Sequence, residues 1–356
     1  MRKIAIRTIG AIVVAAAVVL GIMAFMEYRS WNKPWGTADQ QFNIEISEGM
    51  NARQIGNLLV ENGVLKNTTL FLILADLRGF GEKLKAGEYL VKGTQSPYEI
   101  VEMFAEGKNY LRSLVVPEGF TQIDIAKALE GLQVCKKEDF LKECLSRNIF
   151  KFVVVQAPGG ANAACEGILF PDTYFFIKNQ ETERIFDRMS NHFQKEWEKI
   201  LEDAFKIKAN GWWWQEGGAS ESQQTHRVVV LASIIEKEAK HDEDRPLIAS
   251  VFVNRMKKNM PLQADSTIHY ALEDWSRSLQ LSDLEFDSPY NTYKNVGLPP
   301  AAICNPGEAS LRAAAMPADS EYLYFLTMKD GSAQFSMTNE DHIKLKIEMK
   351  RQKGAE

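Results

Sequence analysis

The feature that most constrains this chain is an uncharged apolar run of 18 residues near its start, from Ile9 to Met26. A helix of that length just spans the hydrocarbon core of a bilayer. Three basic residues precede the run, and such residues mark the cytoplasmic end of a membrane helix. The sequence therefore predicts a cytoplasmic tail at residues 1–8, a membrane helix at 9–26 and export of the rest of the chain.

A cleavable signal peptide is the alternative interpretation of this run, because it shares the basic start and the apolar core. The run is longer than the core of most signal peptides. Its small residues, Ala15 to Ala17, lie in the middle rather than at the end, where a cleavage site would be. These features favour an uncleaved anchor, and both interpretations place the bulk of the protein outside the cytoplasm.

The composition is that of an ordinary globular protein, with 25% charged and 45% hydrophobic residues. A net charge of −5 and the lack of a sustained basic stripe argue against nucleic acid as a partner. The four cysteines are too few for a disulfide framework and lack the spacing of a zinc site. Cys135 and Cys144 are candidates to pair, with buried free thiols as the alternative; the other two are Cys165 and Cys304.

Two folded units are predicted after the apolar run. Residues 27–41 are polar and interrupted by proline and glycine, as in a linker. Residues 42–108 contain strand and short helix patterns typical of a small α+β module, without clustered histidine, cysteine or paired acids. We expect binding or spacing there rather than chemistry. Residues 111–350 form a larger α+β unit, in which three adjacent tryptophans at 212–214 predict a loop or insertion that contacts sugar or lipid, or packs inward.

An apolar run at 228–239 is the predicted centre of the larger unit, because two carboxylates are set into its end. Its helix-forming residues predict one buried helix from about Thr225 to His241. On that helix Glu236 has small neighbours one turn away, whereas the neighbours of Glu238 are bulky. Small neighbours leave room for a ligand, and burial of a carboxyl group favours general-acid chemistry. A helix end whose acids are simply solvated is the alternative.

Two polar segments after this helix, at 260–271 and 288–306, are punctuated by proline and glycine. Polar groups on rigid loops beside an apolar helix suit a carbohydrate cleft, since a sugar requires many polar contacts and an aromatic face. The hydrogen-bonding side chains of the two segments are Gln263, Asp265, Ser266, Thr267, Tyr290, Asn291, Thr292 and Tyr293.

The order of these segments resembles that of the endolytic murein transglycosylase family (MltG or YceG-like), from the anchor to the C-terminus. The resemblance is carried by VPEG at 116–119, EGILFPDTY at 166–174, LASIIEKEA at 231–239, VFVNRM at 251–256, LQADSTIHY at 262–270, YNTY and GLPP within 290–300, NPG at 305–307 and YLYF at 322–325. The tryptophan-rich segment departs from the family, whose counterpart is shorter.

The resemblance implies that residues 42–108 are a LysM-like subdomain, that 111–350 are the catalytic domain, and that the family's catalytic glutamate falls on Glu236. The implied reaction cleaves the β-1,4 bond between N-acetylmuramic acid and N-acetylglucosamine inside nascent glycan strands and leaves a 1,6-anhydro end, which terminates strand elongation. One carboxyl group performs this reaction with neither a metal nor a cofactor. We expect the carboxyl and the sugar to be oriented by Gln263, Asp265, Tyr290 and Asn291.

Two other classes of function stay open at this stage. A hydrolase of the same polymer uses water and a second carboxylate, for which Asp265 and Glu238 are the candidates. A non-catalytic scaffold binds peptidoglycan through the 42–108 module and has no need of Glu236. In each case the resemblance implies a single-pass inner-membrane protein with its large domain on the periplasmic side, and peptidoglycan synthases as partners.

Overall fold

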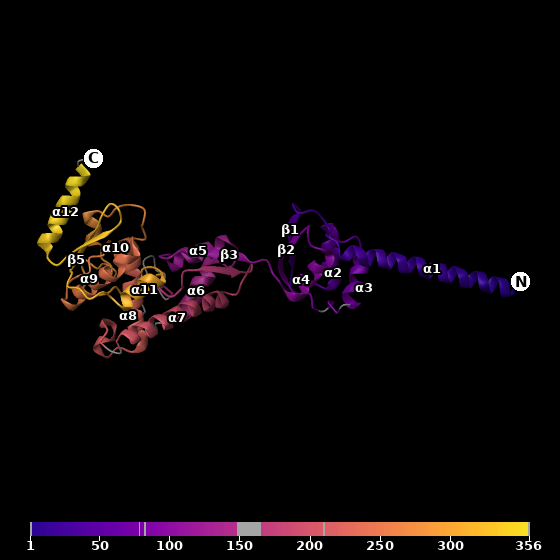
Figure 1. Ribbon diagram of the computed structural model, residues 1–356, viewed down its shortest axis with the longest axis horizontal. Helices are drawn as coiled ribbons and strands as arrows, with labels where there is room; N and C mark the ends of the chain where they lie inside the picture. Colours follow the sequence, from indigo (N-terminus) through magenta and orange to yellow (C-terminus); the bar gives the residue numbers. More distant parts are fainter. Residues whose placement is uncertain (1, 78, 82, 148–164, 209–210, 355–356) are drawn as a thin grey trace. The chain divides into compact units, whose positions relative to one another are not determined.

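The computed structural model describes residues 2–77, 79–81, 83–147, 165–208 and 211–354 (Figure 1). The chain divides into two compact units, Met1–Arg112 and Ser113–Glu356. Both units combine helices with small two-stranded sheets, so the predicted α+β class is confirmed.

The first unit begins with a long helix, α1 (Arg2–Trp31). Its segment Val14–Trp31 is the one stretch of the described residues that is long and apolar enough to cross a membrane, and nearly all of it is exposed. Length and composition of this kind suit a membrane anchor and a signal sequence equally. At the end of α1, the Trp31 ring stacks on Phe71 with ring centroids 6.2 Å apart.

A small α+β module completes the first unit. β1 (Gln41–Ile46) pairs antiparallel with β2 (Gly87–Lys92), and this two-stranded sheet is accompanied by α2 (Ala52–Glu61), α3 (Thr68–Leu77) and α4 (Pro97–Glu106). Capping boxes begin α2 and α4, so side chains satisfy backbone donors that a helix start would otherwise leave free. The module has its own buried core, which includes Ile44, Ile46, Ile55, Leu59, Phe71, Tyr89, Val91, Ile100 and Phe104.

The second unit opens with β3 (Arg112–Val115), which pairs with β4 (Thr173–Phe176). Between these strands lie α5 (Gln122–Gly131) and α6 (Lys137–Arg147), and the long helix α7 (Thr182–Ile207) follows β4 and packs against α6 (Figure 1). Buried residues recur along α7 every three or four positions, as the amphipathic pattern at 182–205 predicts.

A disulfide joins Cys144 on α6 to Cys165, with the two Cα atoms 5.4 Å apart. Of the two alternatives left open for Cys135 and Cys144, a bridge between them is excluded, and a free thiol is found for Cys135 only. Cys144 lies on the buried face of α6 and Cys165 is itself fully buried, whereas Cys135 precedes the helix and remains a free thiol, as does Cys304.

The central helix is α8 (Glu221–Glu238), which begins four residues before the predicted start at Thr225. Ser220 is its N-cap in a capping box, while the Thr225 hydroxyl donates to the Glu221 carbonyl inside the first turn. From Val228 onward every residue up to position 235 is buried, so this segment is enclosed on all sides.

The helices that pack against α8 include α9 (Arg245–Lys257) and α11 (Glu308–Ala315). The remaining elements are η2 (Trp213–Gly218), η3 (Asp242–Asp244), α10 (Asp265–Leu272), η4 (Leu281–Glu285), the antiparallel pair β5 (Tyr324–Thr327) and β6 (Ala333–Ser336), and α12 (Asn339–Gly354).

Two of the three adjacent tryptophans, Trp213 and Trp214, hold the chain before α8 against the end of α11. Trp212 and Trp214 are buried and Trp213 is partly buried, which confirms inward packing over exposed indoles. The indole N–H of Trp213 donates to the Ala314 carbonyl at 2.8 Å, and that of Trp214 to the Ala315 carbonyl at 3.0 Å. These bonds satisfy carbonyls that the end of a helix leaves unpaired.

Candidate active site

Glu236 lies in the last turn of α8, and its carboxyl group is held by two donors from different parts of the chain. Its Oε2 accepts the backbone N–H of Gly307 at 3.0 Å. Its Oε1 lies 3.5 Å from Nη2 of Arg245, and the Glu236 side chain is only 7% exposed. Fixed donors of this kind stabilise the carboxylate that remains after a carboxyl group gives up its proton.

Arg245 is the first residue of α9 and is itself buried. Its Nε donates to Asp242 at 2.9 Å and its Nη1 to the Ser310 hydroxyl at 2.6 Å. The planar guanidinium group is therefore fixed on two sides before it meets Glu236, which a lysine ammonium could not reproduce.

Gly307 caps the start of α11, and its position leaves no room for a side chain. A β-carbon added there would lie 1.8 Å from Oε1 of Glu118. Its φ of −78° is open to any residue, so the glycine is required for space rather than for backbone freedom. The carboxyl groups of Glu118 and Glu236 thus meet at the same residue.

Glu118 comes from the turn between β3 and α5, which is tied to the segment before α11. Gly119, at φ +80°, donates its N–H to the Asn305 carbonyl, and Asn305 donates its own N–H to the Phe120 carbonyl, both at 2.8 Å. Partial burial raises the pKa of Glu118, and the negative charge of Glu236 raises it further, whereas Arg245 lowers it.

Glu166 is a second buried carboxyl group in this part of the fold, at the start of the EGILFPDTY loop. It accepts the backbone N–H of Gln122 at 2.9 Å, the side-chain amide of Asn305 at 3.2 Å and the hydroxyl of Tyr270 at 3.2 Å. Burial raises its pKa to about 8, so the group is largely protonated at neutral pH. We assign it a structural role, because it joins four segments of the chain.

Gln263 and Asp265 are exposed residues at the start of α10. Gln263 accepts from Nη1 of Arg255 at 3.3 Å, and Asp265 accepts the Tyr293 hydroxyl. The neighbouring Glu238 accepts the backbone N–H of Ser266 at 3.3 Å, and burial raises its pKa. This group of side chains is organised around the start of α10.

Tyr290 and Asn291 are almost completely buried. The Asn291 amide donates to the carbonyls of Leu284 and Phe286, and its oxygen accepts the backbone N–H of Tyr293, so it fixes the shape of its own loop. The Tyr290 ring packs 5.0 Å from that of Tyr270, measured between centroids.

Among the described residues, the direct polar partners found for the Glu236 carboxyl group are Gly307 and Arg245. The structure therefore brings none of the four predicted substrate-binding residues into polar contact with Glu236. The residues that do surround it were not predicted individually as site residues. The sequence offers one signal for two of them. Glu118 and Gly307 each follow a proline, in the VPEG and NPG segments that carry the family resemblance.

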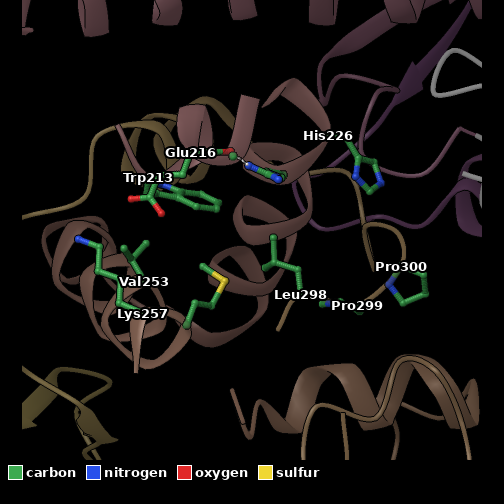
Figure 2. A pocket seen from close by; sticks show the side chains of 11 residues that line it. Trp213, Glu216, His226, Val253, Lys257, Leu298, Pro299 and Pro300 are labelled. Carbon is green, nitrogen blue, oxygen red and sulfur yellow. Dashed lines mark hydrogen bonds between the residues drawn. The ribbon is translucent and has the colours of Figure 1, made fainter. Parts of the chain in front are cut away.

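The GLPP segment lies elsewhere, in a pocket of about 650 Å³ beside the first half of α8 (Figure 2). Trp213 and His226 line this pocket together with Leu298, Pro299 and Pro300. Burial lowers the pKa of His226 to about 4, so its ring is neutral at pH 7. His226 precedes Glu236 by ten residues of one helix, a distance of about 15 Å, so this pocket is separate from the carboxyl site.

Comparison with known proteins identifies the family. The YceG-like family matches residues 44–348, which is most of the chain. The chain belongs to the YceG-like family. The described part of this YceG-like chain shows no group of three or more His, Cys, Asp or Glu side chains that could hold a metal ion.

Curated relatives and a solved structure agree with this assignment. An endolytic murein transglycosylase of Bacillus subtilis is 32% identical over 315 residues, which cover 85% of this YceG-like chain and 83% of the relative. One from Streptococcus pneumoniae R6 is 29% identical over 84% of this chain, which spans only 56% of that longer relative. The crystal structure of a putative YceG-like protein of Listeria monocytogenes superimposes with a TM-score of 0.55, at 35% identity, over 86% of this chain and 99% of that one.

Proposed function

We propose that this protein is an endolytic peptidoglycan lytic transglycosylase, with Glu236 as its catalytic residue. The names of the relatives support the reaction class, and the buried carboxyl group between two fixed donors supports the residue. The substrate bond is the β-1,4 link between N-acetylmuramic acid and N-acetylglucosamine within a glycan strand, and the cut terminates strand elongation.

The chemistry requires one carboxyl group that works in both directions. Glu236 donates its proton to the bridging oxygen as the bond from that oxygen to C1 of the muramic acid breaks. The resulting carboxylate then takes the proton of the sugar's own 6-hydroxyl as O6 bonds to C1. The Gly307 N–H and Arg245 stabilise the carboxylate between these two steps, and no water is consumed.

The other predicted residues take supporting roles in this proposal. Gln263 and Asp265 are exposed and available to contact the sugar, while Tyr290 and Asn291 hold the loop beside them. The 42–108 module serves as a LysM-like subdomain for glycan, α1 anchors the protein in the inner membrane, and residues 111–350 act on its periplasmic side. Peptidoglycan synthases are the proposed partners.

Mass spectrometry of peptidoglycan digested by the full-length protein, beside Glu236→Gln, tests this function. The amide of the variant can still accept the Gly307 N–H but cannot donate a proton as an acid. We expect 1,6-anhydro fragments from the wild type and none from the variant. Fragments with reducing ends, heavier by one water, would identify a hydrolase. Equal binding of glycan with no fragments from either protein would identify a scaffold.

A further inference from the structure

Glu118 places a second carboxyl group beside the one to which the reaction is assigned. Glu118 is exposed as a residue, yet its Oε1 occupies the space that a side chain at Gly307 would fill. The same glycine donates its N–H to Glu236. The neighbouring Gly119 closes the arrangement, since a β-carbon there would lie 3.7 Å from Cγ of Glu236.

The charged groups that shift the pKa of Glu118 lie on α8, η3, α9 and α11, and most of them are negative. Its pKa is raised by burial first, then by Glu236 of α8, with Asp242 before α9 and Glu308 of α11 adding to the effect. Arg245 opposes them. The Lys237 ammonium also lies close to the turn, 3.4 Å from the β-carbon position of Gly119, but it sits over the Trp275 ring.

We propose that Glu118 is a positioning residue for the acid: it forms a coupled carboxyl pair with Glu236, and the pair carrying one proton is the working form of the enzyme. The negative charge of Glu236 raises the pKa of Glu118, so the pair keeps one proton more firmly than an isolated Glu118 would. This inference rests on the proposed function and adds a second residue to its site.

The coupling determines where activity is lost as the pH rises. Proton donation to the bridging oxygen stops when the pair loses its last proton. Replacing Glu118 by glutamine removes a negative charge that opposes this loss while keeping the side chain's shape. The alkaline limb of the pH–rate profile then moves to lower pH by about one unit, which is about a tenfold lower rate at any pH above the limb.

The test is the rate of anhydro-fragment formation by the full-length protein between pH 4 and 9, for the wild type, Glu118→Gln and Glu118→Asp. We expect the alkaline limb to move only in the glutamine variant, since aspartate keeps the charge. Glu202→Gln is the matched control, because it removes a carboxylate from the exposed face of α7, where Glu202 pairs with Lys206. Thermal unfolding of each variant confirms that all of them fold.

Two results would overturn the proposal. A Glu118→Gln profile that coincides with the wild type would show that the two carboxyl groups are not coupled. A uniform loss of rate with an unmoved limb would show that Glu118 contacts the sugar or supports the turn instead. Failure of the proposed function is distinct from both, since in that case the wild type itself produces no anhydro fragments.

Discussion

Glu236 and Gly307 lie 71 residues apart in the sequence and are joined by a 3.0 Å hydrogen bond from the glycine N–H to the carboxyl oxygen. The bond links the end of the buried helix α8 to the start of α11. Because the donor is a backbone group at a helix start, its direction is fixed and the partial positive charge of the helix end adds to it. Because the donor is a backbone N–H, substitution of Glu236 leaves it in place. A different side chain at position 236 can therefore still accept this hydrogen bond.

The narrow space at Gly307 predicts the effect of adding one methyl group there. In Gly307→Ala the new β-carbon would overlap the Glu118 carboxyl, which has to move away from Glu236. We expect activity above the alkaline limb to fall about tenfold, as in Glu118→Gln, with a small loss of thermal stability. Gly131→Ala, in a helix position with open space around it, should change activity little and raise stability by up to about 1 kcal/mol. Equal activity of both variants would contradict the argument.

The guanidinium group of Arg245 makes a second prediction. Arg245→Lys keeps the charge but loses the planar fork that joins Asp242, Ser310 and Glu236. We expect a cost of about 2 kcal/mol in urea unfolding and a larger fall in kcat than in substrate binding. The matched change Arg184→Lys, in an exposed pair with Glu181, should cost less than about 1 kcal/mol.

Glu166 makes the stability of the protein depend on pH. Burial raises its pKa from 4.5 to about 8, so the folded state binds a proton that the unfolded state has lost across this range. Its contribution is fully present below about pH 4.5 and is lost as the pH rises through 8, at about 1.4 kcal/mol per unit. Glu166→Gln mimics the protonated group. We therefore compare the unfolding free energies of Glu166→Gln and the wild type from pH 5 to 9. The difference in favour of the variant should grow up to about pH 8 and then stay constant.

The disulfide predicts how the protein responds to reductant. Cys144 and Cys165 are separated by 21 residues in the sequence, and a crosslink that closes a loop of this size stabilises a fold by about 3 kcal/mol. We expect a lower midpoint of thermal unfolding in reductant, and the same decrease in Cys144→Ser without reductant. Cys135→Ser, which removes a free thiol, serves as the control and should leave the response to reductant intact.

Helix spacing alone predicts the central helix and distinguishes its two glutamates. The apolar run at 228–235 predicts a buried helix, and the difference in neighbour size separates Glu236 from Glu238. In the structure, Glu238 contacts the start of α10, while Glu236 faces Gly307 and Arg245. The helix start is wrong by four residues, because a capping box at Ser220 outweighs the threonine at 225.

Contacts between distant segments are what the sequence could not supply. Glu118, Arg245 and Gly307 come from three separate parts of the chain, and neither charge nor spacing shows that they meet. The need for glycine at 307 depends on where Glu118 lies, which is a property of the folded chain. Asn291 shows that a polar loop residue can be predicted for substrate binding and yet be bonded within its own loop. Its amide donates to the backbone carbonyls of nearby residues.

The hydrogen bond from the Asn305 amide to the Phe120 carbonyl spans 185 residues, and the same side chain accepts the N–H groups of Gly167 and Leu169. Synthesis delivers the chain from its N-terminus, so the turn with Glu118 and the helix with Glu236 both wait for the segment at 305–307. A partly made chain cannot align its carboxyl groups. The arrangement of the two carboxyl groups is therefore complete only when the chain is present as far as residue 307.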